Sequence, residues 1–242
     1  VNNLEVYPQG STLLSWSYMP RFGDIVIINV YHDTAGNIAP PAFDKFMAIE
    51  QTFNTFRTAS HKSMADELEQ ASGYRNIWFT TTVHNDIRIY NKIVELHEQM
   101  VDEWKGKAQD PDFITQCVFQ AIPTSFSKHS VANGGNIMGL DREKDNVVMI
   151  LFDIAVKGVD LETMAQEIIK RYGAKIEEFA ASVGGLADWK HLNYAGGFQD
   201  PLASYGEANV AKMRAASTKY DHNGVFQNKS PAGFKISKSG TA

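Results

Sequence analysis

The stretch 147–157 constrains the fold more than any other part of the chain. Its alternate residues form one unbroken apolar face, whereas the opposite face carries Asp153 and Lys157. An alternation of period two predicts a β-strand with one face against a core and one partly polar face. Residues 161–183 follow directly with apolar residues at helical spacing, which predicts a long amphipathic helix. The apolar face of the strand comprises Val148, Ile150, Phe152, Ile154 and Val156.

Shorter segments with the same kinds of pattern flank this unit. Some segments show the alternation of strands, and others show the spacing and capping residues of helices. Together they predict an α+β fold in which helices pack on one face of a sheet. The predicted strands are residues 3–7, 12–19, 25–31, 75–84 and 113–122. The predicted helices are residues 41–50, 61–71, 86–104 and 206–220.

The other face of the predicted sheet carries polar side chains. Gln116 and Gln120 alternate with apolar residues in one predicted strand, and Asn29 and Tyr31 do so in another. Such a face can be solvated without any function. It can also form the wall of a site that a second domain closes, and the pattern alone leaves both interpretations open.

Composition excludes several classes of function. The chain has 242 residues and a net charge of −5, which gives no electrostatic case for binding nucleic acid or an anionic membrane. No apolar run approaches the roughly 20 residues that span a bilayer. The single cysteine, Cys117, excludes an internal disulfide and cysteine-rich metal sites, and we expect no metal. The chain starts at Val1 without a signal-peptide pattern, so we expect a soluble protein, processed or a fragment, of unknown localisation.

Common catalytic motifs are absent from the sequence. Residues 134–139 are rich in glycine, but Asn136 breaks the G-x-G-x-x-G pattern of dinucleotide-binding loops. We find no nucleophile elbow, no H-E-x-x-H and no P-loop, and the seven histidines lack the spacing of metal ligands. Residues 134–139 belong to a predicted loop over 123–146, and loops of this length are often functional.

Residues 189–206 carry the strongest candidate for chemistry. The pair Asn193 and Tyr194 stands shortly before Gly196 and Gly197, where the backbone can turn sharply or approach a ligand closely. The pattern predicts a strand end that delivers polar side chains to a rigid turn. From the residues alone, Tyr194 is either a base or an ordinary buried, hydrogen-bonded tyrosine.

A series of short motifs runs through nearly the whole chain in a fixed order. Towards the C-terminus, these motifs are residues 192–195, 199–206, 209–214, 219–221 and 224–227. Earlier motifs are residues 8–10, 40–44, 118–120 and 134–136. Each motif is weak alone, but their order and spacing together are specific. The series resembles FAD-linked oxidases of the vanillyl-alcohol-oxidase superfamily, in particular the fungal berberine-bridge-enzyme-like members.

The resemblance implies a domain arrangement. Residues 1–19 resemble the end of an FAD-binding domain, and residues 20–190 resemble a substrate-binding domain whose antiparallel sheet covers the isoalloxazine ring. Residues 191–242 resemble a C-terminal segment that returns to the FAD-binding domain. The polar sheet face would then be the ceiling of an active site. Most of the FAD-binding domain is absent from this chain, so a separate FAD-binding domain could be its partner.

The resemblance also implies roles for single residues. Tyr194 matches the family's catalytic tyrosine and would be the base when an alcohol or secondary metabolite transfers hydride to FAD. Asn193 would lie beside the flavin. Gln120 would point at this small-molecule substrate, with Gln116 and Tyr31 as further substrate-binding candidates.

The sequence departs from the family pattern in three places. It has no pyrophosphate-binding loop, and none of the flavin-attaching residues of many relatives, so the chain alone should not hold FAD tightly. Ile122 stands where sugar-oxidising relatives carry an aspartate that helps to activate the tyrosine, which argues against oligosaccharide oxidation. The connection after Met19 is short where the family has a helix.

The alternative to an enzyme fragment is therefore a flavin-free, non-catalytic remnant that acts as a binding module. The choice between oxidase and dehydrogenase stays open.

Overall fold

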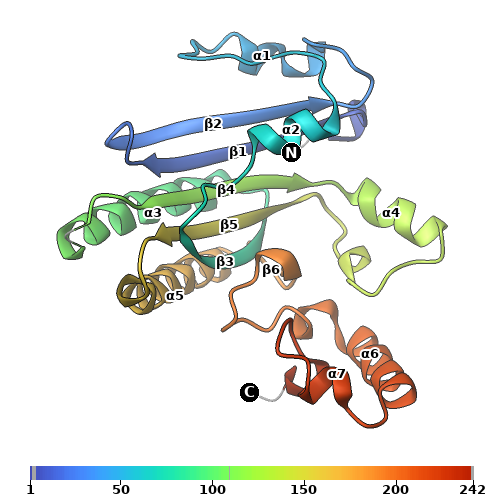
Figure 1. Cartoon of the computed structure of the whole chain (residues 1–242). Helices are drawn as coiled ribbons and strands as arrows, with labels where there is room; N and C mark the ends of the chain where they lie inside the picture. Colours follow the sequence, from blue (N-terminus) through green and yellow to red (C-terminus); the bar gives the residue numbers. More distant parts are fainter. Residues whose placement is uncertain (2–3, 109, 241–242) are drawn as a thin grey trace.

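An antiparallel sheet forms the centre of the protein. The computed structural model describes residues 1, 4–108 and 110–240, and within them the sheet has six strands. These are β1 Gly10–Met19, β2 Asp24–Asp33, β3 Arg75–His84, β4 Ile114–Ile122, β5 Val147–Val156 and β6 Leu186–Ala187. Their order across the sheet is β2-β1-β4-β5-β3-β6, and every neighbouring pair is antiparallel (Figure 1). The α+β fold predicted from the sequence is confirmed.

Two long helices, α3 Ile87–Lys107 and α5 Val159–Ser182, cover one face of this sheet (Figure 1). Asp86 caps α3, because its side chain accepts a hydrogen bond of 2.8 Å from the backbone N–H of Arg88. The apolar face of β5 meets the apolar stripes of both helices, and each large buried side chain contributes roughly 1.5–3 kcal/mol. This core includes Ile150, Phe152 and Ile154 of β5, Ile93 and Trp104 of α3, and Ile168 and Ile176 of α5.

His97 of α3 lies inside this core and is fully buried. Its Nε2 shares a hydrogen bond of 2.8 Å with the hydroxyl of Thr115 on β4. Burial lowers the pKa of His97 to about 3, so the imidazole is neutral near neutral pH. The histidine is therefore a core residue that is tied to the sheet.

The remaining helices lie around the margins of the sheet (Figure 1). They are α1 Asp44–Met47, α2 His61–Glu67, α4 Thr124–Ala132, α6 Glu207–Tyr220 and α7 Val225–Asn228. Short 3₁₀ turns cover Leu4–Val6, Pro41–Phe43, Leu140–Arg142, Leu192–Tyr194, Ala203–Tyr205 and Ile236–Lys238. α4 projects beyond the ends of β4 and β5, and the C-terminal helices lie past β6 (Figure 1).

Two predicted elements are wrong. Residues 4–6 form a 3₁₀ turn rather than part of a strand, because β1 is already paired with β2 and β4 and offers no free edge. Residue 3 of that predicted strand lies outside the described residues. The predicted loop over 123–146 contains α4, in which only Ser127 is buried. A helix with so little buried surface leaves almost no periodic signal in the sequence.

The register of the strands corrects the assignment of one face. We call the face that points away from α3 and α5 the second face. Leu13 of β1 lies opposite both Val30 of β2 and Gln120 of β4, so these side chains share the second face. Tyr31, which pairs with Thr12, therefore lies on the helix side of the sheet. Alternation defined the two faces of each strand, but it did not show which face of β2 joins which face of β4.

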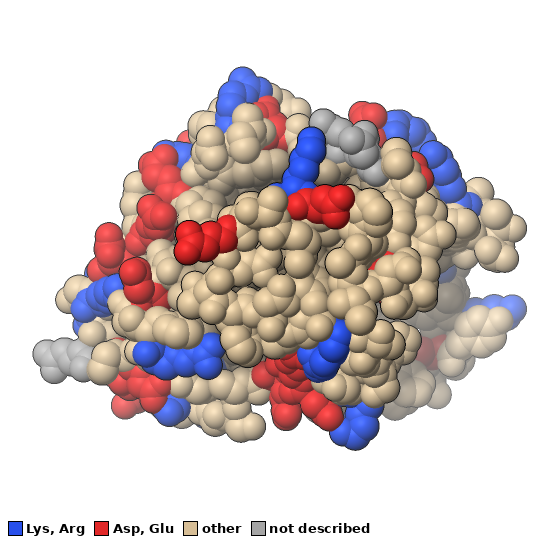
Figure 2. Space-filling model, turned by 90° about the horizontal axis from the view of Figure 1, so that it is seen from above, with Lys and Arg blue, Asp and Glu red and all other residues tan. Residues whose placement is uncertain are grey.

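The β2 edge of the sheet carries exposed apolar side chains. Residues 20–23 connect β1 to β2 directly in a tight turn. This is the short connection that the sequence predicted at the point where the family has a helix. Figure 2 views the molecule from the α1 side and shows a broad uncharged area bordered by charged side chains. Exposed apolar residues of this part of the chain are Phe22, Ile27, Ile38, Phe46, Ile49 and Phe53.

Candidate functional site

A cavity of about 600 Å³ opens on the second face, at the ends of β4 and β5. Its floor is formed by Gln120, Ile122 and Met149 of the two strands. One wall comes from α4 and the following loop, and the other comes from residues 189–212. A cavity of this size, with mixed apolar and polar lining, suits a small organic molecule. The lining also includes Phe126, Ser127, Ser130, Val131, Ile137, Met138, Asp141, Trp189, His191, Tyr194, Asn209 and Lys212.

A 3₁₀ turn over Leu192–Tyr194 brings Tyr194 to this cavity. The backbone N–H of Tyr194 donates a hydrogen bond of 3.0 Å to the carbonyl of His191. Because residues three apart align in a 3₁₀ turn, the two rings meet edge to face with their centroids 4.9 Å apart. On its other side, the Tyr194 ring packs edge to face against the ring of Trp78 on β3, with the two ring centroids 5.4 Å apart. The tyrosine is thus held between a histidine and the sheet.

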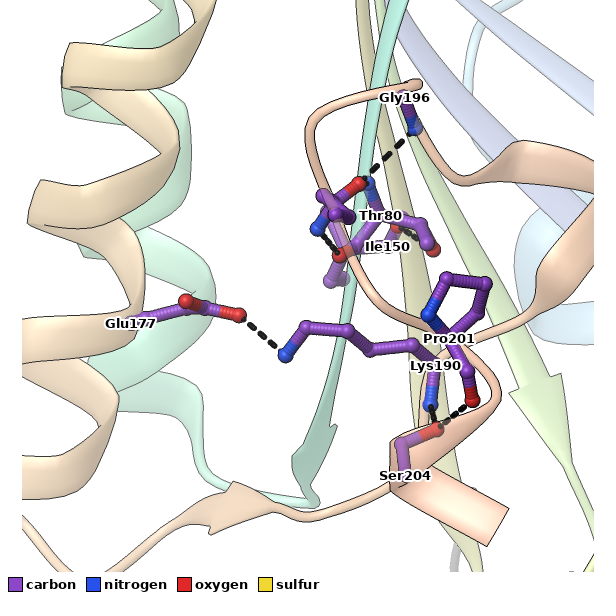
Figure 3. A network of polar contacts seen from close by, with 8 residues as sticks. Thr80, Ile150, Glu177, Lys190, Gly196, Pro201 and Ser204 are labelled. Atoms are coloured by element: carbon purple, nitrogen blue, oxygen red, sulfur yellow. Dashed lines mark hydrogen bonds and ion pairs between the residues drawn. The ribbon is translucent and has the colours of Figure 1, made fainter. Parts of the chain in front are cut away.

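Trp189 and Lys190, which precede this turn, are held by contacts on opposite sides of the chain. Trp189 is buried, and its indole N–H donates a hydrogen bond of 3.1 Å to the carbonyl of Met138, which joins the two walls of the cavity. Lys190 points the opposite way and forms an ion pair of 2.7 Å with Glu177 of α5 (Figure 3). The backbone N–H of Lys190 donates to the hydroxyl of Ser204 at 3.0 Å. Alternation therefore sends residues 189 and 191 into the cavity and residue 190 out of it.

The chain after the turn lies against the edge of β3. Gly196 is buried, and a Cβ there would collide with the carbonyl oxygen of Trp78. At Gly196 the backbone closely approaches the sheet, whereas Gly197 has open space around it. The close approach to a ligand that this glycine pair allows stays a prediction. The backbone N–H groups of Gly196 and Thr80, both labelled in Figure 3, donate hydrogen bonds to the side-chain Oε1 of Gln199.

The structure brings Gln120 and Tyr194 together, since both line the cavity. The side-chain Oε1 of Gln120 is buried and has no hydrogen-bond partner among the described residues. A buried acceptor without a donor is costly, so this atom has capacity to hold a ligand O–H or N–H. Sequence analysis identified both residues, although only the fold shows that they share one cavity.

The other predicted site residues lie elsewhere. Gln116 is on the second face but does not line the cavity. Asn193 is exposed beside the turn. Tyr31 lies on the opposite face, where its ring packs against Phe43 at 5.0 Å and stacks on Phe56 at 5.8 Å. The structure therefore does not place Tyr31 near Gln120 and Tyr194.

Two titratable residues near the site were not singled out from the sequence. Asp153 of β5 is buried on the second face between Gln116 and Trp78, and burial raises its pKa to about 8. His191 is half-buried, and burial lowers the pKa of its imidazole. The only sequence signal for His191 as a site residue was its position three residues before Tyr194. That spacing is informative only once a 3₁₀ turn is known.

The structure adds two negative findings, both limited to the described residues. No group of three or more His, Cys, Asp or Glu side chains among them could hold a metal ion. None of their helices has the length and apolar character that crossing a membrane requires.

Comparisons with known proteins point to flavin enzymes. No family model matches the chain. It is 34% identical over 241 residues to the FAD-dependent monooxygenase drtC of Aspergillus calidoustus, a match that covers 98% of this chain and 45% of that protein. It is also 34% identical over 200 residues to the FAD-dependent monooxygenase sdcF of Emericella nidulans, covering 83% of this chain and 42% of that protein. The chain spans less than half the length of these curated relatives.

A solved structure shows the same fold. The structure of 6-hydroxy-D-nicotine oxidase from Arthrobacter nicotinovorans superposes with a TM-score of 0.57 and 12% identity, covering 92% of this chain and 47% of that chain. The sheet with its helices thus resembles a domain of an FAD-linked oxidase. The two relatives are thus named as FAD-dependent enzymes, and the solved structure shares the fold.

Proposed function

We propose that this chain is the substrate-covering part of an FAD-dependent oxidoreductase of the berberine-bridge-enzyme-like type, and that the cavity holds its small-molecule substrate. One observation carries the proposal. Tyr194 and Gln120 come from distant parts of the sequence and line one cavity, in which the Oε1 of Gln120 lacks a donor. Substrates in this proposal are alcohols or secondary metabolites that bear a hydroxyl or a similar acidic hydrogen.

In this proposal, Gln120 and Tyr194 have different roles toward the substrate. Gln120 accepts a hydrogen bond from the substrate and fixes its orientation. Tyr194 receives the proton that the substrate hydroxyl releases, which is general base catalysis. FAD, when bound, supplies the acceptor for the hydride that leaves the substrate carbon. Trp78 and His191 hold the Tyr194 ring on both sides, so its hydroxyl has a defined direction.

Gln120 offers the cavity one buried oxygen without a hydrogen-bond partner among the described residues. A flavin ring carries N–H as well as C=O groups, so the ring or the substrate could donate to it. Asn193, exposed beside Tyr194, is the residue that we propose lies next to the flavin. Gln116 lies on the second face outside the cavity, so it could contact only a substrate that extends beyond the cavity.

The proposal includes the domain boundaries. The resemblance put residues 1–19 at the end of an FAD-binding domain, but β1 (Gly10–Met19) pairs with β2 and β4, so we propose that it belongs with residues 20–190 to the substrate-binding domain. Residues 191–242 are proposed to return to the FAD-binding domain. The last segment docks on the sheet through Gly196 and Gln199 and forms a second apolar cluster with Trp189, Leu202 and Ile236. It therefore belongs to the same packed unit as the sheet in this structure.

The test joins the chain to the FAD-binding domain of a relative such as drtC and follows flavin bleaching anaerobically by stopped flow. With a reducing substrate found by screening, the Tyr194→Phe variant should reduce FAD about 10²–10⁴-fold more slowly. Tyr220→Phe is the control, because Tyr220 is exposed on α6. Bleaching at the wild-type rate in Tyr194→Phe would remove Tyr194 from the mechanism.

A second measurement separates an enzyme part from a flavin-free binding module. The chain alone is mixed with FAD and passed through gel filtration, and we expect it to emerge colourless. The fusion should retain yellow flavin absorbance through the same column. A fusion that also loses FAD would favour the flavin-free alternative.

A further inference from the structure

His191 and Tyr194 form a pair of side chains inside the cavity. The turn that separates them aligns their rings at 82°, with the centroids 4.9 Å apart. The His191 ring also lies against the buried Trp189 at 5.7 Å. Since Trp189 is tied to Met138, the imidazole has little freedom to swing away from Tyr194.

The ring nitrogens of His191 are open for a hydrogen bond or a proton. Neither ring nitrogen of His191 has a hydrogen-bond partner among the described residues. The other charged groups that line the cavity are Asp141, in the turn Leu140–Arg142, and Lys212 of α6, and both side chains are exposed. His191 is therefore the titratable side chain that contacts the Tyr194 ring; the contact is between the two rings, and no hydrogen bond joins the Tyr194 hydroxyl to His191 among the described residues.

We propose that His191 is the proton-accepting partner of Tyr194, a positioning residue that lets the phenol act as a base near neutral pH. The inference rests on the proposed function. The substrate hydroxyl gives its proton to the Tyr194 oxygen, as the phenolic proton of Tyr194 passes to a ring nitrogen of His191. The substrate C–H electron pair leaves as hydride to FAD. The products are the oxidised substrate, a neutral tyrosine, an imidazolium and a flavin that would carry the two electrons and the hydrogen of the hydride, so protons and electrons balance.

The chemistry of the cavity supports this partnership. A phenol ordinarily ionises near pH 10, so it needs a neighbour that can take its proton at lower pH. Burial lowers the pKa of the His191 imidazole, so the ring is neutral near pH 7 and has a lone pair open for a proton, although the same shift makes it a weaker base than a free imidazole. Ile122, on the cavity floor, supplies no carboxylate that could serve instead.

The proposal can be tested on this chain without flavin, because base assistance also raises the reactivity of the phenol. The probe is N-acetylimidazole at low extents of labelling, with mass spectrometry of the tryptic peptide 191–212. That peptide contains Tyr194 together with Tyr205, which is buried and serves as an internal control, while Tyr220 is exposed and serves as an outside reference.

Acetylation of Tyr194 should be about tenfold or more slower at pH 7.5 in His191→Phe than in the wild type, because the packing ring stays but the base is lost. The gap should close at alkaline pH, where hydroxide can take the proton without His191. His222→Phe, a change in an exposed turn, should leave Tyr194 unaffected. Equal rates for wild type and His191→Phe at pH 7.5 would overturn the proposal.

The fusion with an FAD-binding domain separates this inference from the proposed function. For His191→Phe, flavin reduction should slow near neutral pH and recover at high pH or with added imidazole. Tyr194→Phe should stay slow under all these conditions. If Tyr194→Phe is slow and His191→Phe matches the wild-type pH profile, the function stands and the role of His191 is rejected.

Discussion

The side chain of Gln199 completes the hydrogen bonding of Thr80 at the edge of β3. Its Oε1 accepts a hydrogen bond of 3.0 Å from the backbone N–H of Thr80, and its Nε2 donates one of 2.8 Å to the carbonyl of the same residue. A primary amide thus takes the place of a strand just beyond the point where β6 stops. The same Oε1 accepts from the backbone of Gly196 at 3.1 Å, which ties the loop after Tyr194 to the sheet.

Replacing Gln199 should therefore destabilise the protein. Gln199→Ala leaves the N–H and C=O of Thr80 without protein partners, and we expect a loss of about 1–3 kcal/mol in the free energy of unfolding. Urea denaturation followed by far-UV circular dichroism measures it. Gln51→Ala is the matched control, because Gln51 is exposed and water can replace its contacts with the carbonyl of Met47 at 3.4 Å and with the side chain of Asn54 at 2.9 Å. Equal losses in the two variants would contradict the edge-capping role.

The sequence predicted the sheet well because its strands are strongly periodic. The strand predicted over 75–84 coincides with β3, and the alternation around Phe152 correctly placed the face that meets the helices. The pattern could not fix the register between distant strands, and for this reason Tyr31 was assigned to the wrong face. Registers depend on pairings that no single segment contains.

The site was only partly predictable for a related physical reason. Tyr194 and Gln120 were identified as separate residues through a family resemblance. That they share a cavity depends on how residues 189–206 pack across the sheet edge, and this rests on contacts such as Gln199 with Thr80. His191 stayed unnoticed because a 3₁₀ turn of three residues has no sequence periodicity of its own.

The ion pair between Lys190 and Glu177 should contribute to the anchoring of the turn (Figure 3). Both side chains are mostly buried, with 22% and 28% exposed, so the pair is less screened than a surface pair. A double-mutant cycle with Lys190→Met and Glu177→Gln should give a coupling energy of about 1 kcal/mol. The exposed pair of Lys62 and Asp66 on α2 is the reference, with an expected coupling near zero. Similar couplings in both cycles would show that Lys190 does not anchor the turn.

Gly139 should be hard to replace, because it joins the loop after α4 to the C-terminal segment. Its φ is +71°, and an added Cβ would collide with the carbonyl of Tyr205. Gly135 also has a positive φ, of +80°, but has open space around it. Gly135→Ala should therefore cost only backbone strain of about 1 kcal/mol. Gly139→Ala should cost clearly more in urea denaturation, and equal losses would show that the loop shifts freely.

The buried carboxyl of Asp153 should make stability fall as the pH rises. Its pKa is raised by burial to about 8 in the folded chain, against about 3.9 in an unfolded one. Between these values, the unfolded chain has released the proton while the folded chain still holds it. Raising the pH therefore favours unfolding by up to about 1.4 kcal/mol per pH unit, and the stabilisation present below pH 4 is lost by pH 8.

Asp153→Asn isolates this effect, because the amide keeps the shape of the protonated carboxyl and cannot ionise. The difference in unfolding free energy between the variant and the wild type should move in favour of the variant from pH 5 to pH 8. Taking the difference removes the opposite trend of His97, whose lowered pKa makes stability fall as the pH drops below about 6.5. A difference that stays constant over this range would mean that Asp153 ionises in the folded protein as it does in the unfolded chain, and that water or a rearranged partner reaches its carboxyl.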